Sequence, residues 1–406
     1  MEVLSPELPE PGGVAGSAHS HESPAGTSVS AVLHRIGTIP DILYPAWRDL
    51  ALDASEPNSF GETWFLGAGL RAFAVEDDVR LVEVRLGDGA DALLIGLMPL
   101  CLRRDYGRMR VLHVQNWGHF HTFLGTPLIR NGFERRFWTA ILEALDAADW
   151  APNFLHVHGL VDNGPVLAGL EAAADMVGRS CPIVHRSARA LLASHLAPEA
   201  YYEATVRKKK RKELQRLSRR LAELGKLESR SLAADEPVEP WCEAFLALEC
   251  SGWKGESGSA LANSAETRSF FLEAVQGAAA EGRLQMLRLD LDERPIAMLV
   301  NFLAPPGSFS FKIAFDEAYA RFSPGVLIQL DNLQILRRND IDWMDSCAAE
   351  NHPMIESLWG ERRNIVRVTV RLRGFRHGLV YGICRTLETG AAWVRALRRP
   401  EREPVE

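Results

Sequence analysis

The stretch from Phe309 to Leu336 combines the residue types and spacing with the clearest chemical potential. Its first part, 309–316, predicts a strand, and an apolar run that opens at Gly325 or Val326 predicts a helix. Pro324 suits the first turn of that helix, and Gly325 lets a ligand approach the backbone closely. Because first-turn N–H groups are unpaired and carry the positive end of the helix dipole, this helix start can hold a phosphate or pyrophosphate. The simpler alternative is a well-formed helix start without a ligand.

Two further clusters carry groups that suit a binding or catalytic cleft. Trp253 and Lys254 stand between glycines in a predicted loop, which would expose an aromatic ring beside a cation. The alternative is a tryptophan that packs on the core beside a solvated lysine. In the predicted strand Ile341–Cys347, alternation places Asp345 on the apolar face, so its carboxylate is buried or lines a cleft. Asp340 and Asp342 are expected to be solvated.

A long basic helix is the strongest charge feature of the chain. Residues 205–226 contain ten Lys or Arg and two Glu. Leucines recur at spacings of three and four residues, so one face docks and the other is cationic; they are Leu214, Leu217, Leu221 and Leu224. The basic helix 207–220 could therefore bind a phosphate-rich partner, such as a nucleotide, a nucleic acid or an anionic membrane. The alternative is an ordinary solvated helix.

The histidines and cysteines do not form a recognisable metal pattern. His119 and His121, like His156 and His158, alternate along the chain, but no acidic partner stands at a suitable spacing. Packed or hydrogen-bonded histidines are the favoured interpretation, and no metal is predicted. The six cysteines lack zinc spacing and are expected to be reduced thiols in a reducing compartment. Walker A, dinucleotide-binding and nucleophile-elbow motifs are absent from the sequence.

The order of predicted elements divides the chain into four parts. We expect a disordered segment over 1–30, a first half over 31–195, a second half over 196–375, and an Arg-rich tail over 376–406. Each half is predicted to combine helices with a run of antiparallel strands, which gives an α/β (α+β) class. The similar order suggests a duplicated unit, although residue identity does not prove a repeat.

Composition limits the location and the partners of the protein. A formal net charge of −7 argues against whole-surface attraction to nucleic acid, while local basic patches remain compatible with it. The longest uncharged apolar run, Ala92–Leu102, is about half the length of a membrane span. The N-terminus has no Lys or Arg before Arg35 and so lacks the basic start of a signal peptide. A cytoplasmic location is therefore expected.

Several of these motifs together resemble a known family, the CelD/BcsL-like GNAT acetyltransferases, which are related to the FemAB-type aminoacyl transferases. The resemblance covers roughly residues 40–360. In the second half it rests on Arg219–Gly225, Trp253-Lys254-Gly255, Pro295-Ile296-Ala297, Phe311–Asp316, Phe322-Ser323-Pro324-Gly325 and Trp359-Gly360. In the first half it rests on Pro57-Asn58-Ser59-Phe60 through Phe73, and on Trp117-Gly118-His119 through Thr126-Pro127-Leu128.

The resemblance implies two tandem GNAT-like halves, each a mixed, mostly antiparallel sheet flanked by helices. It also implies acetyl-CoA or another acyl-CoA as co-substrate. GNAT proteins usually carry Arg/Gln-x-x-Gly-x-Gly/Ala at the pyrophosphate loop, whereas the segment Arg321–Val326 has a single glycine. The chain thus departs from the family pattern where the donor is expected to bind.

Within such an enzyme, the residues around the helix start take provisional roles. The pyrophosphate is expected on the N–H groups of Gly325 and Val326, with Arg321 and Ser323 beside them. Backbone N–H groups of 311–315 would polarise the acyl carbonyl. Asp316, Glu317 or Asp345 would act as base, and Tyr319 would protonate the leaving thiolate. Acceptor binding is expected at Trp253, Lys254 and Lys312.

Two rival functions remain open from the sequence. A FemAB-like transferase would take its acyl group from aminoacyl-tRNA, and the basic helix would supply phosphate contacts. A non-catalytic scaffold of a polysaccharide-secretion system would bind no acyl donor. The resemblance implies an amine or hydroxyl acceptor in polysaccharide (cellulose) or cell-envelope biosynthesis.

Overall fold

The computed structural model describes residues 28–75, 77–89 and 91–397. The predicted disordered segment therefore lies outside the described residues, apart from its last few residues, which enter the first strand. The first half contains β1 (Val29–Arg35), α1 (Leu43–Leu52), η1 (Ser59–Gly61), α2 (Thr63–Phe73), β2 (Arg80–Leu86), β3 (Leu93–Tyr106), β4 (Met109–Asn116), β5 (Leu128–Ile129), α3 (Glu134–Ala147), β6 (Phe154–Val161), α4 (Pro165–Met176) and β7 (Ile183–Leu192).

The second half repeats much of this order and ends in a long helix. It contains α5 (Pro198–Thr205), α6 (Lys208–Ala222), β8 (Leu227–Ser231), α7 (Glu239–Cys250), α8 (Trp253–Glu256), η2 (Leu261–Asn263), α9 (Ala265–Ala280), β9 (Leu284–Leu291), β10 (Arg294–Ala304), β11 (Gly307–Phe315), η3 (Glu317–Phe322), α10 (Pro324–Asp331), η4 (Asn332–Arg337), β12 (Trp343–Asp345), η5 (Ile355–Ser357), β13 (Glu361–Arg371) and α11 (Phe375–Leu397).

The strands of the described residues form one sheet whose order reads alike from both edges. From one edge, β1, β2, β3 and β4 are antiparallel, β6 is parallel to β4, and β13 is antiparallel to β6. From the other edge, β8, β9, β10 and β11 are antiparallel, β12 is parallel to β11, and β7 is antiparallel to β12. The predicted mixed α/β class, with a large mixed sheet flanked by helices, is confirmed.

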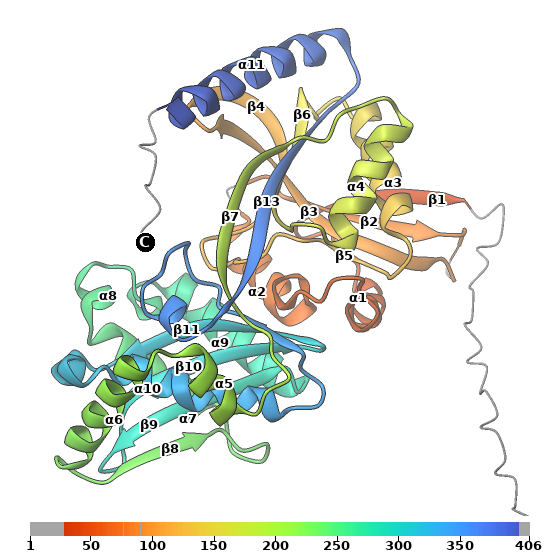
Figure 1. Ribbon diagram of the computed structural model, residues 1–406. Coiled ribbons are helices and arrows are strands. Elements are labelled where there is room, and N and C mark those ends of the chain that lie inside the picture. Colours follow the sequence, from red (N-terminus) through yellow and green to blue (C-terminus); the bar gives the residue numbers. More distant parts are fainter. Residues whose placement is uncertain (1–27, 76, 90, 398–406) are drawn as a thin grey trace, which may run out of the picture.

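The two halves exchange their last strands at the centre of this sheet. β7 follows β6 in the sequence but pairs with β12 of the second half, whereas β13 comes last in the sheet and pairs with β6 of the first half. β7 and β13 pair with each other and appear in Figure 1 as the long strands that join the two parts of the molecule. The boundaries at 195 and 375 stay a prediction, and β13 lies on the first-half sheet although it precedes 375.

Helices cover the sheet with separate apolar clusters. α3 and α4 pack on the first half through Phe137, Trp138 and Leu170. In the second half, α7 and α9 cover one face and α6 and α10 the other. One cluster also includes Trp64 and Phe65 of α2, so the apolar core is continuous between the halves. Each fully buried aromatic of this kind contributes on the order of 1.5–3 kcal/mol.

Gly277 allows the helices α2 and α9, one from each half, to pack closely. A Cβ atom at Gly277 of α9 would lie 2.5 Å from the Cβ of Trp64 in α2. Because that distance is shorter than real Cβ contacts, any larger residue would push the two helices apart.

Four predicted elements differ from those observed. The expected loop at Trp253 contains the short helix α8, in which the N–H groups of Gly255 and Glu256 donate to the carbonyl of Gly252. The expected helix to Leu336 changes to a 3-10 helix at Asn332. The strand expected over 341–347 is limited to β12 because Cys347 has a left-handed backbone, φ 54°. The Arg-rich tail, for which the amphipathic stretch Leu387–Leu397 predicts a helix, forms a helix that begins earlier, at Phe375.

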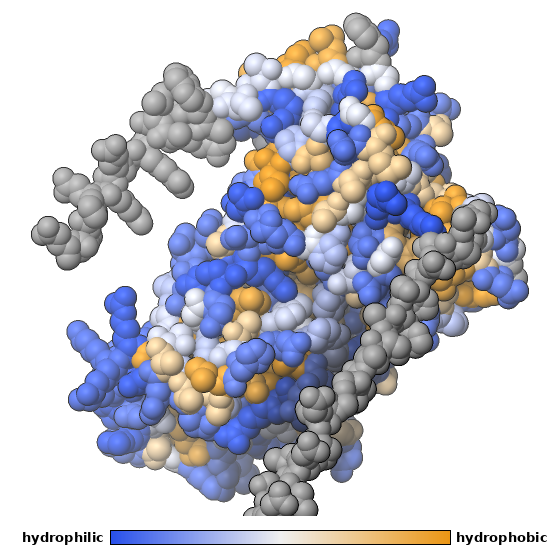
Figure 2. Space-filling view, turned by 45° about the vertical axis from the view of Figure 1, so that its right-hand side comes forward, coloured by the Kyte–Doolittle hydropathy of each residue, from blue (hydrophilic) through white to orange (hydrophobic). Residues whose placement is uncertain are grey.

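Surface polarity is mixed over the visible face of Figure 2, where hydrophilic and hydrophobic residues are interspersed. Among the described helices, none is both long and apolar enough to cross a membrane.

Candidate functional site

An opening in the sheet lies between β11 and β12. These parallel strands pair from Gly307–Trp343 to Phe309–Asp345, whereas β11 continues to Phe315. Beyond the last pair, β11 therefore has no neighbour in the sheet on its β12 side. A ligand could approach the backbone of β11 where the two strands diverge.

A bulge bends β11 within this opening. Val300 of β10 pairs with Lys312 and Asn301 pairs with Ser310, so Phe311 is an extra residue in β11. Bulges re-aim side chains next to functional sites. The Nζ of Lys312 lies 5.8 Å from the ring centre of Phe123 and 5.9 Å from that of Phe120, both in the first half. Lys312 thus faces the junction between the halves.

The helix start predicted from Pro324 and Gly325 is present, with a special turn before it. Ser323 has left-handed backbone angles, φ 55° and ψ 51°, and its carbonyl accepts the N–H of Val326 at 2.9 Å. The N–H of Gly325 has no hydrogen-bond partner among the described residues. Two free N–H groups, those of Gly325 and Val326, were expected at this helix start, and only that of Gly325 is free among the described residues. The exposed guanidinium of Arg321 stacks on the ring of Phe322 at 4.8 Å.

Three of the predicted catalytic residues surround the 3-10 helix η3. Asp316 caps η3 by accepting the N–H of Ala318 at 3.0 Å, and its Oδ2 lies 3.5 Å from Arg294. Glu317 is exposed, and Tyr319 is partly buried against the cluster under α6 and α10. These groups lie at the end of β11, near the helix start.

The predicted acceptor residues Trp253 and Lys254 lie on α8, and their side chains fall outside the described part of the structure. Their neighbour Gly252 faces Glu317, since a Cβ atom there would lie 3.2 Å from the Oε1 of Glu317. Gly252, Glu317 and the end of β11 line a small hollow of about 30 Å³. The structure therefore brings the start of α8 next to η3.

A buried network of amides holds α10 against the sheet. The amide nitrogen of Asn301 in β10 donates to the side-chain oxygen of Asn332 at 2.7 Å, and Asn332 donates to Gln329 of α10 at 3.0 Å. Gln329 in turn donates to the hydroxyl of Ser310 in β11 at 3.5 Å. Although the Oδ1 of Asn301 has no hydrogen-bond partner among the described residues, these bonds link α10 to β10 and β11 and so position the helix start relative to the bulged strand. The sequence gives no signal for it, because the partners are far apart along the chain.

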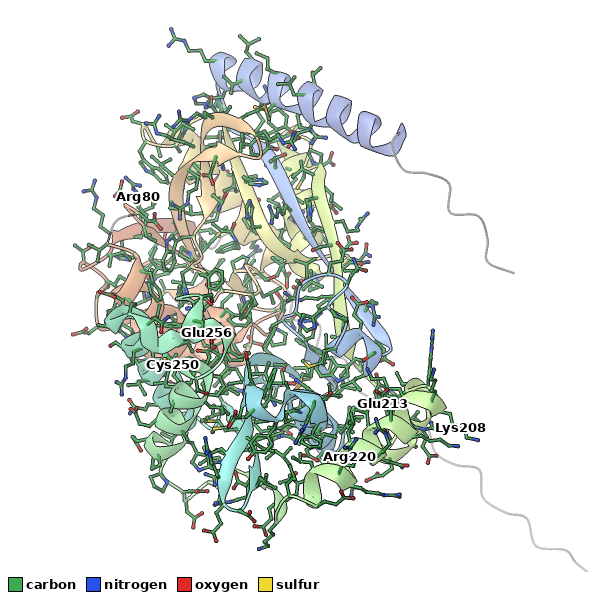
Figure 3. All side chains as sticks on the ribbon, turned by 90° about the vertical axis from the view of Figure 1, so that its left-hand side faces the viewer. Arg80, Lys208, Glu213, Arg220, Cys250 and Glu256 are labelled. Atoms are coloured by element: carbon green, nitrogen blue, oxygen red, sulfur yellow. The ribbon has the colours of Figure 1, made fainter. Side chains whose placement is uncertain are left out.

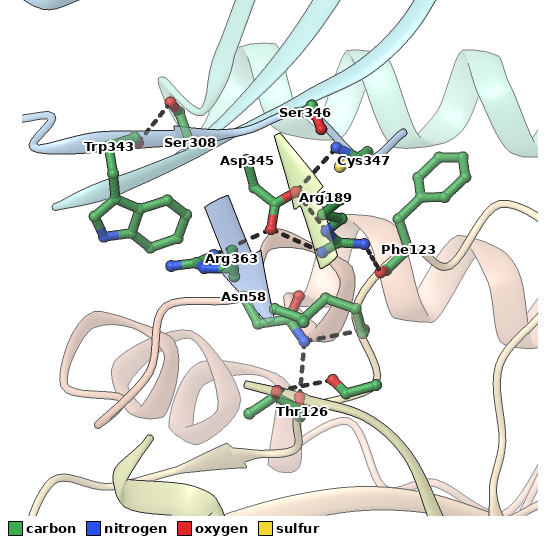
Figure 4. Close-up of polar contacts among 12 residues, drawn as sticks. Asn58, Phe123, Thr126, Arg189, Ser308, Trp343, Asp345, Ser346, Cys347 and Arg363 are labelled. Carbon is green, nitrogen blue, oxygen red and sulfur yellow. Dashed lines mark hydrogen bonds and ion pairs between the residues drawn. The ribbon is translucent and has the colours of Figure 1, made fainter. Parts of the chain in front are cut away.

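Asp345 lies apart from the other predicted catalytic residues. It pairs with Phe309, seven residues before Asp316, which corresponds to roughly 20 Å along a strand. Its carboxylate is fully buried and is contacted by Arg189 of β7 at 2.8 Å and by Arg363 of β13 at 3.2 Å (Figure 4). The N–H of Cys347 also donates to it at 2.9 Å. These contacts favour a positioning role, and its catalytic role stays a prediction.

The arginines of this network connect the exchanged strands with the first half. Arg189 also donates to the carbonyl of Phe123 at 2.7 Å, in the loop after β4 (Figure 4). The guanidinium of Arg363 stacks on the ring of Trp343 at 3.7 Å. Burial lowers the pKa of Arg363, an effect that the facing Asp345 opposes. Neither arginine was singled out from the sequence, because their shared partner is remote along the chain.

In the first half, the equivalent opening between β4 and β6 is bridged by the side chain of Asn116 and by the loop that contains Gly125 and Thr126. Asn116 donates to the carbonyl of His158 at 2.9 Å and accepts its N–H at 2.8 Å. The N–H of Gly125 donates to the carbonyl of Gly159 at 3.1 Å, and the hydroxyl of Thr126 donates to the same oxygen. The opening between β4 and β6 is thus closed by hydrogen bonds.

The predicted histidine pairs are packed among aromatic rings. His119 stacks on Phe65 at 5.5 Å and contacts Phe270, and burial lowers its pKa to about 3. His158 also has a pKa of about 3, chiefly because of burial. His156 lies 4.2 Å from His158 between ring centres. A cavity of about 270 Å³ remains beside them, bordered also by Arg367.

A groove of about 810 Å³ is lined by residues of α1, α2 and α9, and the buried carboxyl of Glu62 lies at its wall. Glu62 accepts the indole N–H of Trp64 at 2.9 Å and lies 3.6 Å from Arg283. Burial raises its pKa to about 7. The charged form is therefore disfavoured in the folded protein.

This pKa predicts a pH-dependent stability that Glu62→Gln removes. The pKa of Glu62 in the folded protein lies above its ordinary value of 4.5. The contribution of Glu62 to the free energy of unfolding is therefore greatest at low pH and is lost as pH rises toward 7. From pH 5.5 to 8 we expect wild type to lose about 2 kcal/mol relative to Glu62→Gln. Urea unfolding at both pH values measures it. Glu273 is an exposed residue of the same groove, so the stability of Glu273→Gln should depend on pH as that of wild type does. If Glu62→Gln lost as much stability between the two pH values as wild type, Glu62 would not be the group responsible.

Comparison with known proteins identifies the segment that holds the opening. Residues 208–352 match the family described as acetyltransferase (GNAT) domain. This segment is similar to GNAT acyltransferase domains. It includes β11, η3, α10 and β12, which form the opening and the helix start. The narrower CelD/BcsL-like assignment stays a prediction, and a comparison with curated proteins found no match.

Solved structures show the same fold over most of the chain. The crystal structure of FemX superposes with a TM-score of 0.54 at 9% identity, over 84% of this chain and 98% of that one. A conserved protein of unknown function from Bacteroides thetaiotaomicron VPI-5482 gives 0.51 at 11% identity, over 82% and 98%. A tandem GNAT protein from the clavulanic acid biosynthesis pathway gives 0.43 at 15% identity, over 85% and 99%. At such identities the likeness concerns the fold alone.

Proposed function

We propose that the protein is a GNAT-type acyltransferase that transfers an acetyl or other acyl group from acyl-CoA to an amine or hydroxyl acceptor. The observation that carries the proposal is the divergence of β11 from β12 beside the helix start at Gly325, within the GNAT-like segment. The first half has the equivalent strands, but hydrogen bonds of Asn116 and Gly125 bridge the opening between them. A single donor site, in the second half, is therefore the arrangement we favour.

The donor would lie between β11 and the start of α10. Its pyrophosphate would accept the N–H of Gly325, with the cation of Arg321 and the turn at Ser323 beside it. The acyl carbonyl would then lie beside β11, where backbone N–H groups would polarise it. Because one free N–H group faces the phosphate in place of several, the guanidinium of Arg321 must supply more of the attraction for the phosphate.

Transfer requires a nucleophile that loses a proton and a thiolate that gains one. The acceptor nitrogen or oxygen attacks the thioester carbon, and Asp316 or Glu317 takes the proton directly or through water. Collapse of the tetrahedral adduct breaks the C–S bond, and Tyr319 protonates the sulfur. Asp316 accepts the N–H of Ala318 and Glu317 is exposed, and both carboxylates lie at the end of β11, so either could serve as the base. Lys312, Trp253 and Lys254 would contact the acceptor.

A FemAB-like, aminoacyl-tRNA-dependent activity is the second candidate, and the basic helix is the observation that favours it. The apolar face of α6 is buried through Leu214, Leu217 and Leu221, while Lys208 and Arg220 project to solvent in Figure 3. Lys212, Arg216, Arg219 and Arg220 border a groove of about 350 Å³ on this helix. This face suits a phosphate-rich partner, whose binding would weaken steeply with salt.

A thermal-shift series tests the proposed donor. Acetyl-CoA and longer acyl-CoAs are expected to raise the melting temperature, because a ligand at 100 times its Kd stabilises the native state by about 2.7 kcal/mol. A transfer assay with amine and hydroxyl acceptors of polysaccharide or envelope type follows. Salt-sensitive binding of aminoacyl-tRNA without an acyl-CoA effect would favour the second candidate. Binding of neither donor would indicate the non-catalytic scaffold.

A further inference from the structure

The C-terminal helix α11 is attached to the molecule by a narrow contact. It lies at the top of Figure 1, across the ends of β4 and β6. One side packs on a small cluster in which Cys384 meets Tyr106 and Phe154, with Val380 and Tyr381 beside them. The adjoining side of the helix has no partner among the described residues that would cover it.

That adjoining side presents a row of large apolar side chains to solvent. Leu379, Ile383 and Leu387 are 60%, 54% and 55% exposed. Because they are spaced by four residues, they lie on one face of the helix. Gly378 and Gly382 stand next to this row and leave a shallow hollow of about 370 Å³. In Figure 2, hydrophobic residues gather at the top of the molecule, at the height of α11.

The same part of the chain is basic, in contrast to the whole protein. Residues 371–406 include eight arginines and four glutamates, whereas the full chain has a formal net charge of −7. Arg373 and Arg376 are exposed at the start of the helix. Glu388, the one acidic residue in the sequence of α11, is paired with Arg385 at 2.6 Å, so its charge is compensated within the helix. The partner of this surface should therefore be both apolar and anionic.

We propose that α11 docks in the plane of an anionic lipid surface. The row formed by Leu379, Ile383 and Leu387 would enter the boundary between headgroups and acyl chains, and the arginines would contact lipid phosphates. An amphipathic helix with arginines and exposed leucines has the composition of such interfacial helices. A second copy of α11 suits this surface less well, because it would bring two arginine-rich segments together.

This docking would hold the enzyme at a membrane without a spanning segment. The inference does not depend on acyl-CoA as donor, because it concerns a surface remote from the opening at β11. Anionic headgroups would attract the arginines, and the apolar row would provide the part of the binding that persists at high salt.

Vesicle flotation of the full-length protein tests the proposal. We expect binding to vesicles of phosphatidylcholine with 30% phosphatidylglycerol, and at least roughly tenfold weaker binding to phosphatidylcholine alone. Leu379→Ser/Ile383→Ser/Leu387→Ser should reduce binding at least tenfold. Arg373→Gln/Arg376→Gln should reduce it several-fold and make it less sensitive to salt. Both changes affect exposed side chains, and circular dichroism checks that the variants stay folded.

A matched control separates this surface from general surface hydrophobicity. Ile42 and Leu52, each 74% exposed on the first half, are replaced by serine together and should leave vesicle binding unchanged. Equal loss in this control, or equal binding to neutral and anionic vesicles, would overturn the proposal. Concentration-dependent dimerisation that the triple serine variant abolishes, without vesicle binding, would also overturn it in favour of a second copy.

Discussion

Replacing Asp345 by asparagine is expected to lower the free energy of unfolding by about 3–5 kcal/mol. The Asp345 carboxylate is fully buried and faces the guanidinium groups of Arg189 and Arg363. Its removal would leave two buried cations without a counter-ion at the place where the halves exchange β7 and β13. The loss of a charge partner in such a position costs far more than the loss of a surface pair. Urea unfolding followed by circular dichroism measures the change.

Asp340 offers a matched control for this prediction. It pairs with Arg338 at 2.7 Å on the surface, so Asp340→Asn should cost no more than about 1 kcal/mol. The triple change Asp345→Leu/Arg189→Met/Arg363→Met should recover much of the stability, because an apolar replacement removes all three buried charges together. Similar unfolding of Asp345→Asn and Asp340→Asn would show that the network carries little energy. Loss of acyl transfer with stability retained would instead indicate a catalytic Asp345.

The Asp345 network also marks what the sequence could and could not predict. The sequence predicted that Asp345 is buried or lines a cleft and that Asp340 and Asp342 are solvated; the structure buries Asp345 and exposes the other two, which precede β12. The identity of its partners could not be predicted, because Arg189 and Asp345 are 156 residues apart. Hydrophobic periodicity locates strands, but it does not tell which strand becomes the neighbour of another. The exchange of β7 and β13 is a property of pairing between distant segments and leaves no local pattern.

The donor region shows the same division between local and distant information. Pro324 and Gly325 predicted a helix start, and α10 begins there. The N–H of Val326 donates a hydrogen bond to the carbonyl of Ser323. This bond depends on the left-handed backbone conformation of Ser323, which serine does not favour. The opening between β11 and β12 depends on where β12 ends, and β12 ends at Asp345, two residues before the left-handed Cys347. Local residue types therefore located the candidate site, while the backbone around it determined which groups are free.

A leucine at position 325 is expected to weaken acyl-CoA binding by about 10- to 100-fold, equivalent to roughly 1.4–2.7 kcal/mol. A Cβ atom at Gly325 would lie 3.2 Å from Phe315 and 3.7 Å from Ile313, so a larger side chain would fill the space between α10 and β11. The pyrophosphate would lose its close approach to the only unpaired first-turn N–H of this helix start among the described residues. Isothermal titration with acetyl-CoA measures the change.

The specific test of this placement compares acetyl-CoA with acetyl-pantetheine, which carries the same thioester but no pyrophosphate. Gly325→Leu should lower the affinity for acetyl-CoA while changing that for acetyl-pantetheine by less than about threefold, because the contact concerns the phosphates alone. Gly325→Ala should have a small effect, since the nearest side-chain atom needs to move by only a few tenths of an ångström. Gly382→Leu adds the same side chain to a helix with open space around it, and should leave binding unchanged. Equal losses for both thioesters would place the defect in the pantetheine channel, and unchanged binding of both would remove Gly325 from the donor site.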